Sequence, residues 1–478
     1  MAKHPPTIFW HDYETWGATP QKDRPSQFAG VRTDLDLNII GEPVTLYCQP
    51  ADDYLPHPQA CLITGITPQH ATKHGVVEAE FFQKIHQELS QPNSCVAGYN
   101  SIRFDDEVTR YGFYRNFYDP YAREWQNGNT RWDIIDMVRA CYALRPEGIE
   151  WPTHEDGRPS FKLEDLTKAN GIAHESAHDA MSDVYATIAM AKLIKEKQPK
   201  LYDFLFQLRQ KGKVSELIDV YQMTPLVHVS SKLPSQNGCT TWVAPLSYHP
   251  DNKNAVICFN LNYNPQLLLD LSVEEIIERL YTPMDELPDP EERIGLKLVH
   301  INKCPVLAPA KTLLPENAQR LGIDRERCLK HLQVLQAHSQ IREIVAQVYQ
   351  QQKDYPATEN VDYQLYDGFF SPADKEQMER IRNCPPEALG QLTLDFTDPR
   401  LEKLFLRYKA RNYPGTLTIE ESNVWQAYRK AKLMDGEDSP NLTMADFTME
   451  LENLVHEYES DAHKMGILKA LFQYASEL

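Results

Sequence analysis

The pattern of apolar residues changes character twice along this chain, and no single fold class accommodates all three patterns. Residues 1–198 alternate between strand-like and helix-like periodicity, which predicts a layered α/β domain. Residues 199–354 carry short strand-like runs separated by turn residues, and residues 355–478 have helical periodicity. Because 478 residues exceed what one hydrophobic core holds, two or three domains are expected, and the three patterns place three domains at these boundaries.

Four elements define the expected α/β domain. The runs Thr7–Tyr13 and Val44–Cys48 are rich in aromatic and β-branched residues, which favours strands. Ala79–Leu89 and Ser182–Glu196 have helical periodicity, and Pro199 lies just beyond the second of these helices. This order of strands and helices is typical of an α/β layered domain.

The second and third segments differ in kind. The second segment has four strand-like runs, which are Pro225–Ser230, Thr240–Ala244, Ala255–Phe259 and Leu298–Leu307. It becomes helical between Arg325 and Gln352. In the third segment, helices are expected to begin at Ser371-Pro372 and Asp398-Pro399, where an N-cap residue precedes a proline. We therefore expect a small antiparallel β unit followed by an all-helical domain.

Composition excludes several classes of protein. There is no apolar run long enough for a membrane-spanning helix, and the first ten residues lack the apolar stretch of a signal peptide. The nine cysteines form no Cys-x-x-Cys pair, which argues against a zinc site or a disulfide framework and favours the cytoplasm. A net charge of −19 weighs against a nucleic acid partner. Residues 192–213 and 400–433 are locally basic, although each stretch alone is best explained as a solvated helix face.

Three short constellations of acidic residues are candidates for chemistry. Asp12 and Glu14 occupy positions i and i+2 of an expected strand, so both carboxylates face the same side. Asp105 lies at an expected strand-to-helix turn, and Asp183 lies at the start of an expected helix with His178 five residues earlier. Carboxylate oxygens select Mg²⁺ or Mn²⁺. A histidine beside such a metal can accept a proton from an attacking water.

Each constellation also has a simpler structural explanation. Taken alone, Asp12 and Glu14 are better explained as two solvated acids on an edge strand. Asp105 or Asp106 is suited to cap a helix, and a lone loop histidine such as His178 more often caps or packs. Taken together, the three constellations are a stronger signal than any one of them alone.

The combined pattern resembles the DEDD family of 3′→5′ exonucleases, in its histidine branch. The three motifs of that family are Asp-x-Glu, Asn-x-x-x-Phe-Asp and His-x-x-x-x-Asp. In this sequence they are Asp12/Glu14, Asn100 to Asp105, and His178/Asp183. The other branch has a tyrosine four residues before the last Asp, where this chain has Asp179. The resemblance implies an exonuclease domain with a ribonuclease H-like fold.

Longer runs in all three segments resemble bacterial exonuclease I. These runs are His11–Thr15, Arg103–Arg110, Phe113–Tyr121, His178–Tyr185, Leu298–Leu307 and Tyr408–Thr416. The resemblance implies an α/β exonuclease domain, an SH3-like β domain and an all-α C-terminal domain around a groove for single-stranded DNA. It also implies 3′→5′ degradation of that DNA, with roles in DNA repair and recombination. Since the groove is closed by the chain's own domains, a monomer is expected.

The same resemblance implies a protein partner. This is the C-terminal tail of single-stranded DNA-binding protein, which is acidic with an apolar end and therefore needs a basic pocket. Arg145 is the candidate contact, because the run Cys141–Ile149 matches the family.

We expect two-metal hydrolysis. Asp12, Glu14, Asp105 and Asp183 are expected to hold two Mg²⁺ ions roughly 3.5–4 Å apart, with Mn²⁺ as a substitute. His178 is expected to accept the proton of the attacking water, and the products are nucleoside 5′-monophosphates. Whether Asp105 and Asp183 bind metal directly or through water stays open.

An aromatic and arginine-rich stretch, residues 103–132, is the expected source of DNA contacts. Single-stranded DNA is bound by base stacking, worth about 1–3 kcal/mol per base, together with cationic contacts to phosphate. Phe113, Phe117 and Tyr121 recur at helical spacing, so we assign them to the core. We assign Arg110 and Trp125 to DNA.

Glu14 and Lys162 complete the expected substrate contacts. Lys162 stands where the family is expected to carry arginine. Lysine keeps the charge but lacks the bidentate fork, so a phosphate contact here is expected to be looser.

Three alternative functions are considered. The chain is compatible with an exoribonuclease of the same branch, a proofreading exonuclease, or a non-catalytic binding protein. The two additional domains favour a long single-stranded substrate. The presence of all four carboxylates and the histidine argues against the loss of catalysis.

Overall fold

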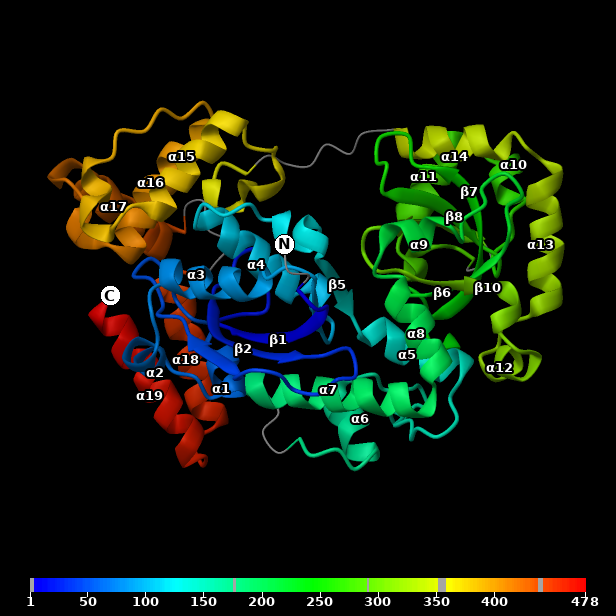
Figure 1. The fold of residues 1–478 in the computed structure, drawn as a ribbon, viewed down its shortest axis with the longest axis horizontal. Helices are drawn as coiled ribbons and strands as arrows, with labels where there is room; N and C mark the ends of the chain where they lie inside the picture. Colours follow the sequence, from blue (N-terminus) through cyan, green and yellow to red (C-terminus); the bar gives the residue numbers. More distant parts are fainter. Residues whose placement is uncertain (1–3, 175–177, 290–291, 351–357, 437–441) are drawn as a thin grey trace. The chain divides into compact units, whose positions relative to one another are not determined.

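The computed structural model describes residues 4–174, 178–289, 292–350, 358–436 and 442–478. The chain divides into two compact units that do not follow the order of the sequence (Figure 1). The first unit contains Met1–Thr130, Glu175–Tyr185 and Pro356–Leu478, and the second contains Arg131–His174 and Ala186–Tyr355. Each unit is built around its own β-sheet.

The sheet of the first unit combines three strands from residues 7–47 with a fourth strand from residues 94–98. Its strands run in the order β3 (Val44–Tyr47), β2 (Pro25–Thr33), β1 (Thr7–Thr15) and β4 (Ser94–Gly98). β1 is antiparallel to β2 and parallel to β4. The carboxyl ends of β1 and β4 therefore lie side by side. A further strand, β5 (Thr130–Asp133), lies where the first unit gives way to the second along the chain.

Strand β2 was not expected from the sequence. All but one of its residues are buried, so the alternation of polar and apolar residues that marks a half-exposed strand is missing. The expected strands Thr7–Tyr13 and Val44–Cys48 are confirmed as β1 and β3.

Helices α3 (Glu78–Leu89) and α4 (Asp105–Arg115) cover one face of this sheet. Phe9 and Tyr13 of β1 point into that core and contact apolar residues of both helices. Because side chains alternate along a strand, Asp12 and Glu14 face the other side of the sheet. The expected helix Ala79–Leu89 is confirmed as α3, and Ser182–Glu196 is confirmed within α7 (Ala180–Lys197).

The C-terminal segment completes two further cores of the first unit. Trp16 and Tyr54 lie in one core with the helices α1 (Pro58–Thr64), α2 (Pro68–His74), α18 (Met444–Glu457) and α19 (Ala462–Glu477). Tyr114 and Phe117 lie in another with α15 (Pro372–Asn383) and α16 (Pro399–Asn412). Helix α17 (Ile419–Lys430) packs on α16. The helix starts expected at Ser371-Pro372 and Asp398-Pro399 are confirmed.

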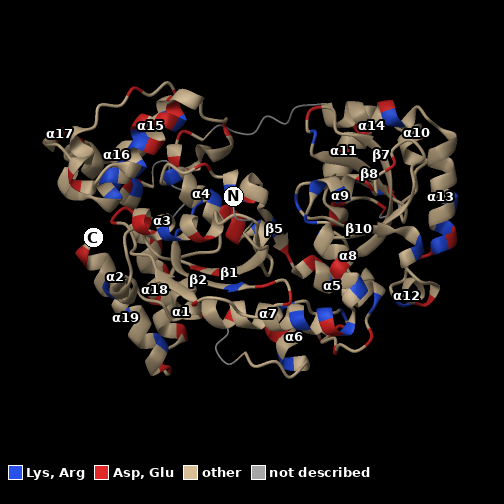
Figure 2. Ribbon diagram, viewed as in Figure 1, with Lys and Arg blue, Asp and Glu red and all other residues tan. Residues whose placement is uncertain are grey.

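The basic stretch 400–433 is only in part a solvated helix face. In Figure 2 basic residues stand out in blue on α16, but the side chains of Arg411 and Lys432 are only 3% and 4% exposed and both form ion pairs with Asp53. Arg411 also pairs with Asp362 at 2.5 Å. These cations therefore hold the C-terminal helices to the N-terminal segment.

The second unit contains a five-stranded antiparallel sheet. Its order is β10 (Val306–Pro309), β6 (Leu226–Val229), β7 (Thr240–Tyr248), β8 (Ala255–Asn260) and β9 (Leu296–His300). The helices of this unit, besides most of α7, are α5 (Ile135–Leu144), α6 (Leu163–Ala169), α8 (Pro199–Gln207), α9 (Lys211–Ser215), α10 (Leu267–Asp270), α11 (Val273–Tyr281), α12 (Pro315–Arg320), α13 (Arg325–Ala337) and α14 (Ile341–Gln350).

The expected single strand Leu298–Leu307 is wrong. The Lys303 N–H donates to the His300 carbonyl at 3.1 Å, and Cys304 has a φ of 47°. This turn ends β9 and leads the chain into β10.

No described helix is long and apolar enough to span a bilayer.

Candidate active site

Three carboxylates from distant parts of the sequence meet in the first unit. Asp12 and Glu14 project from β1, and Asp183 projects from the first turn of α7. One carboxylate oxygen from each lies within 4.8 Å of the others, and all three side chains are half-buried. Among the described residues, this is the only cluster of three or more potential metal ligands.

Asp105 lies beside this cluster. It is the first residue of α4, so it follows β4 at the edge of the sheet where the carboxyl end of β1 also lies. Its side chain is buried, and its Oδ1 accepts a hydrogen bond from the Tyr13 N–H at 3.1 Å. This bond ties the start of α4 to the strand that carries Asp12 and Glu14.

Burial and the neighbouring carboxylates strongly perturb Asp12 and Glu14. Burial, followed by Asp105, Glu14 and Asp183, raises the pKa of Asp12 well above its ordinary value. Burial and Asp183 raise the pKa of Glu14 to about 9. A divalent cation relieves this repulsion, and carboxylate oxygens are the ligands that Mg²⁺ and Mn²⁺ prefer. The residues present therefore fit a metal centre.

His178 lies on the loop that precedes α7. Its side chain is exposed, and its backbone has a φ of 67°, a left-handed conformation that is uncommon outside glycine. Asp179 follows it and caps the helix, because its Oδ2 accepts from the Ser182 N–H at 3.2 Å. The turn thus presents the imidazole to solvent five residues before Asp183.

The expected DNA contacts have contrasting environments. Arg110 is buried, and it donates to Glu124 at 2.8 Å, to Glu107 at 2.7 Å and to the Tyr366 hydroxyl at 3.2 Å. These bonds occupy its guanidinium group, which favours a structural role. Trp125 is 66% exposed and remains available for stacking.

The aromatic residues of 103–132 divide between core and surface. Phe113 and Phe117 are buried as expected, and Tyr121 is half-buried. The three do not share one helix, since α4 ends at Arg115 and Phe117 has a φ of 63°.

Two exposed aromatic residues of the first unit were not predicted from the sequence. Phe369 is 85% exposed and contacts Tyr121 edge-on, with the ring centroids 5.9 Å apart. Tyr366 is 55% exposed and contacts Tyr111 in the same way. No local signal separated these residues from core aromatics, because the neighbouring Phe370 is partly buried against the core that contains Tyr114.

The two remaining candidates lie in the second unit. Lys162 is the N-cap residue of α6, and its side chain is 67% exposed, with Nζ 3.9 Å from the Glu164 carboxylate. Arg145 ends α5 and donates to the carbonyls of Leu144 and Thr312.

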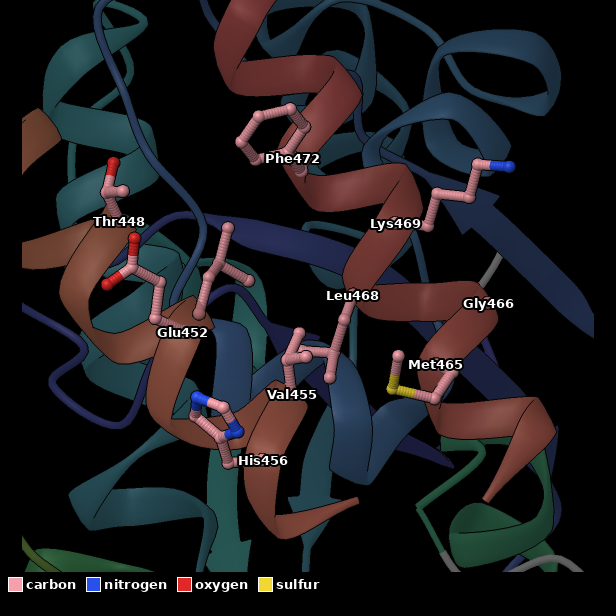
Figure 3. Close-up of a pocket in the computed structure, with 10 residues that line it drawn as sticks. Thr448, Glu452, Val455, His456, Met465, Gly466, Leu468, Lys469 and Phe472 are labelled. Carbon is pink, nitrogen blue, oxygen red and sulfur yellow. The ribbon is translucent and has the colours of Figure 1, made fainter. Parts of the chain in front are cut away.

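The first unit also has an apolar hollow between α18 and α19, of about 610 Å³. Figure 3 shows Val455 and Leu468 on facing helices, with Phe472 and the polar side chains of Glu452 and His456 at the margin. None of its lining residues belongs to the acidic cluster.

Family comparisons match the whole organisation of the chain. A model described as Exonuclease matches residues 9–191, one described as Exonuclease I SH3-like domain matches 209–351, and one described as Exonuclease I C-terminal domain matches 359–478. The chain is 52% identical over 476 residues to exodeoxyribonuclease I of Escherichia coli, covering 100% of this chain and 99% of that protein. The chain belongs to the exonuclease I family.

Other members of the family agree with this assignment. Exodeoxyribonuclease I of Haemophilus influenzae is 52% identical, over 99% of this chain and 98% of that protein. The crystal structure of E. coli exonuclease I with a dA16 oligonucleotide matches with a TM-score of 0.95 over 99% of both chains. A zinc-bound complex of the same enzyme with single-stranded DNA matches with a TM-score of 0.94, 52% identity and the same coverage.

Family membership and the acidic cluster together define the activity. The chain is a metal-dependent exodeoxyribonuclease that degrades single-stranded DNA from its 3′ end. The three expected parts are its exonuclease, SH3-like and C-terminal domains.

Proposed function

We propose that the enzyme hydrolyses the 3′-terminal phosphodiester with two Mg²⁺ ions held by Asp12, Glu14, Asp105 and Asp183. The observation that carries this proposal is the trio of carboxylates within 4.8 Å, where crowding and burial raise the pKa of Glu14 to about 9. When bound, two divalent ions acidify water and neutralise charge at the reacting phosphate. Mn²⁺ is expected to substitute, because it prefers the same ligands.

The protein's own groups divide the remaining tasks. His178 accepts the proton of the attacking water, for which its exposed imidazole on a turn beside α7 is suited. Asp105 contributes one carboxylate oxygen to the metal site, while its Oδ1 accepts a hydrogen bond from the Tyr13 N–H. Nucleoside 5′-monophosphates are the products.

Exposed aromatic side chains support the binding of single-stranded DNA. We assign base stacking to Trp125 and Phe369, which are 66% and 85% exposed. Lys162 supplies a phosphate contact and Glu14 a contact to the terminal nucleotide. The ion pairs of Arg110 support a role in holding the Glu124 segment, so we do not assign it to DNA.

A protein partner and a location complete the proposal. A crystal structure that contains single-stranded DNA-binding protein and exonuclease I matches this chain with a TM-score of 0.91, 51% identity and coverage of 99% of this chain and 100% of that one. We assign the tail of such a protein to a site that includes Arg145, and the enzyme to a monomer in the cytoplasm. The nine free cysteines support a reducing compartment.

One degradation assay tests the activity and the metal. Single-stranded DNA, the matching RNA and a DNA duplex, each labelled at the 5′ end, are incubated with Mg²⁺, with Mn²⁺ or with EDTA. A ladder that shortens from the 3′ end of the DNA strand alone, and only with metal, is expected. Equal degradation of RNA indicates an exoribonuclease, and activity in EDTA refutes metal catalysis.

A further inference from the structure

A buried glutamine connects the acidic face of the sheet to the turn that carries His178. Gln27 lies on β2 directly opposite Glu14 of β1. Residues that oppose each other across two strands point to the same face, so Gln27 shares the face of the acidic cluster. Its side chain is 2% exposed, which makes every polar contact of its amide costly to lose.

Both ends of the Gln27 amide are engaged. Its Nε2 donates to Asp179 Oδ1 at 3.2 Å and to the Tyr47 hydroxyl at 3.1 Å. Its Oε1 accepts from the Ala180 N–H at 3.3 Å. The two residues that directly follow His178 are therefore attached to β2 by one side chain.

Asp179 connects Gln27 both to helix α7 and to His178. Its Oδ2 caps α7 through the Ser182 N–H, and its carbonyl accepts from the Asp183 N–H at 3.1 Å. On the other side it adjoins His178, whose left-handed backbone is unfavourable for a residue with a side chain. Such a conformation persists only where its surroundings hold it.

We propose that Gln27 is a positioning residue for catalysis, holding the turn at Asp179 and Ala180 so that the imidazole of His178 stands over the acidic cluster. This inference rests on the proposed role of His178 as the proton acceptor. Gln27 touches neither the metal nor the DNA in this proposal. It acts only through the place it gives to His178.

A double-mutant cycle tests the proposal. Gln27→Met keeps the length of the side chain and removes the amide, and it is made alone and together with His178→Ala. Single-turnover rates on single-stranded DNA are measured at saturating Mg²⁺, and DNA affinity is measured in EDTA. Gln27→Met is expected to slow the chemical step about 10-fold to 100-fold, since small misplacements of catalytic groups have effects of this size. DNA affinity is expected to stay unchanged.

The His178→Ala background separates positioning from general support of the fold. There Gln27→Met is expected to change the rate less than about twofold, because the group that it positions is absent. An equal loss in both backgrounds overturns the proposal, and so does an unchanged rate in the otherwise native enzyme. A normal rate for His178→Ala alone refutes the proton acceptor itself, which is a different failure.

A second route covers the case in which Gln27→Met does not fold. Asp179→Ser removes the acceptor for Gln27 but keeps a hydroxyl oxygen that caps α7 at Ser182, whereas Asp179→Ala removes both. The proposal requires that the serine variant lose about as much rate as the alanine variant, and recovery of the rate by serine shows that the cap, not the bond to Gln27, matters. Ser26→Ala is the matched control, because Ser26 is equally buried on β2 and its hydroxyl makes no hydrogen bond within the described residues.

Discussion

Close packing of the acidic residues of this enzyme changes their acid–base properties. Asp12, Glu14 and Asp183 each have an ordinary carboxylate, but one oxygen from each lies within 4.8 Å of the others. Burial and this proximity raise the pKa values of Asp12 and Glu14, so in the absence of metal the site binds protons. A divalent cation competes with those protons for the same oxygens. Metal binding and protonation are therefore linked at this site.

Substitutions at Asp183 and His178 should affect different steps. Asp183→Ala removes a proposed metal ligand, and it is expected to lower the single-turnover rate about 1,000-fold or more, since bound metal contributes several kcal/mol. His178→Ala removes the proposed proton acceptor, and a loss of about 10²-fold to 10⁴-fold is expected. Metal titration followed by calorimetry distinguishes them, because only Asp183→Ala should weaken metal affinity. A collapse of metal affinity in His178→Ala shows that the histidine is a ligand.

The raised pKa of Glu14 predicts an unusual pH dependence of stability. Its pKa moves from an ordinary value of 4.5 to about 9 in the folded protein. Between these values the folded state binds a proton that the unfolded chain has released, so metal-free stability falls as the pH rises. The increase in Tm on adding Mg²⁺ should therefore grow from about pH 6 to about pH 9. An increase that is constant over this range contradicts the prediction, and Glu14→Gln should flatten it.

Stacking on exposed aromatic residues should be measurable one ring at a time. Trp125→Ala and Phe369→Ala are each expected to weaken binding of single-stranded DNA by about 1–3 kcal/mol. Tyr221→Ala serves as the control, because Tyr221 is 82% exposed in the second unit and has no assigned role. Fluorescence anisotropy in EDTA measures affinity without degradation. Equal affinities for all three variants refute stacking at these positions.

At the scale of elements, buried ion pairs attach the C-terminal helices to the exonuclease domain. Asp362 receives Arg411 at 2.5 Å, Arg407 at 3.2 Å and Arg24 at 3.4 Å, with 3% of its side chain exposed. Burial opposes its ionisation, but Arg411 and Arg407 outweigh burial and hold the pKa of Asp362 well below its usual range. The carboxylate thus separates three cations that would otherwise repel one another.

Removing this carboxylate should destabilise the first unit. Asp362→Ala leaves the three guanidinium groups buried without their shared partner, and a loss of about 3–5 kcal/mol is expected. Glu216→Ala, in the exposed pair of Lys213 and Glu216, is the control and should cost about 0–1 kcal/mol. Differential scanning calorimetry measures both. A small change in stability of Asp362→Ala shows that water or a rearrangement of side chains compensates the charges of the three arginine residues.

At the scale of the whole molecule, the compact units cut across the order of the segments. The first unit joins residues 1–130 to residues 356–478, which share two apolar cores and the ion pairs of Asp362. Trp16 and Tyr54 of the N-terminal segment pack against Phe447 and Leu468. The exonuclease domain therefore depends on the far end of the chain for its packing.

A fragment of residues 1–198 should not fold by itself. Without the C-terminal helices, the aromatic residues that line both shared cores are exposed, and patches of this kind cause aggregation. Because residues 131–174 and 186–198 belong to the second unit, co-expression with residues 199–478 is expected to give a soluble complex, whereas co-expression with residues 199–354 is not. Size-exclusion chromatography and near-UV circular dichroism compare the two cases. A monodisperse, folded fragment 1–198 contradicts the prediction.

The sequence was most informative where a residue's role depends on local pattern. Strand alternation predicts that Asp12 and Glu14 share a face, and the family motifs single out both residues together with Asp183. It was least informative for long-range partners. The positive charge of Arg110 predicts a DNA contact, but its guanidinium group donates hydrogen bonds to Glu124, fourteen residues away. Strand β2 was not predicted, because a strand that is buried on both faces lacks the alternation of polar and apolar residues that identifies a strand.

The amino-acid sequence by itself determined the family, the order of its three domains and the five residues proposed for catalysis, because motifs and periodicity are properties of neighbouring residues. Only the tertiary structure decided that Asp105 is tied to Tyr13, that Gln27 holds the turn beside His178, and that the C-terminal helices complete the core of the exonuclease domain. These features depend on contacts between residues far apart in the chain. Such contacts form only when burial brings them together, and no local pattern encodes them.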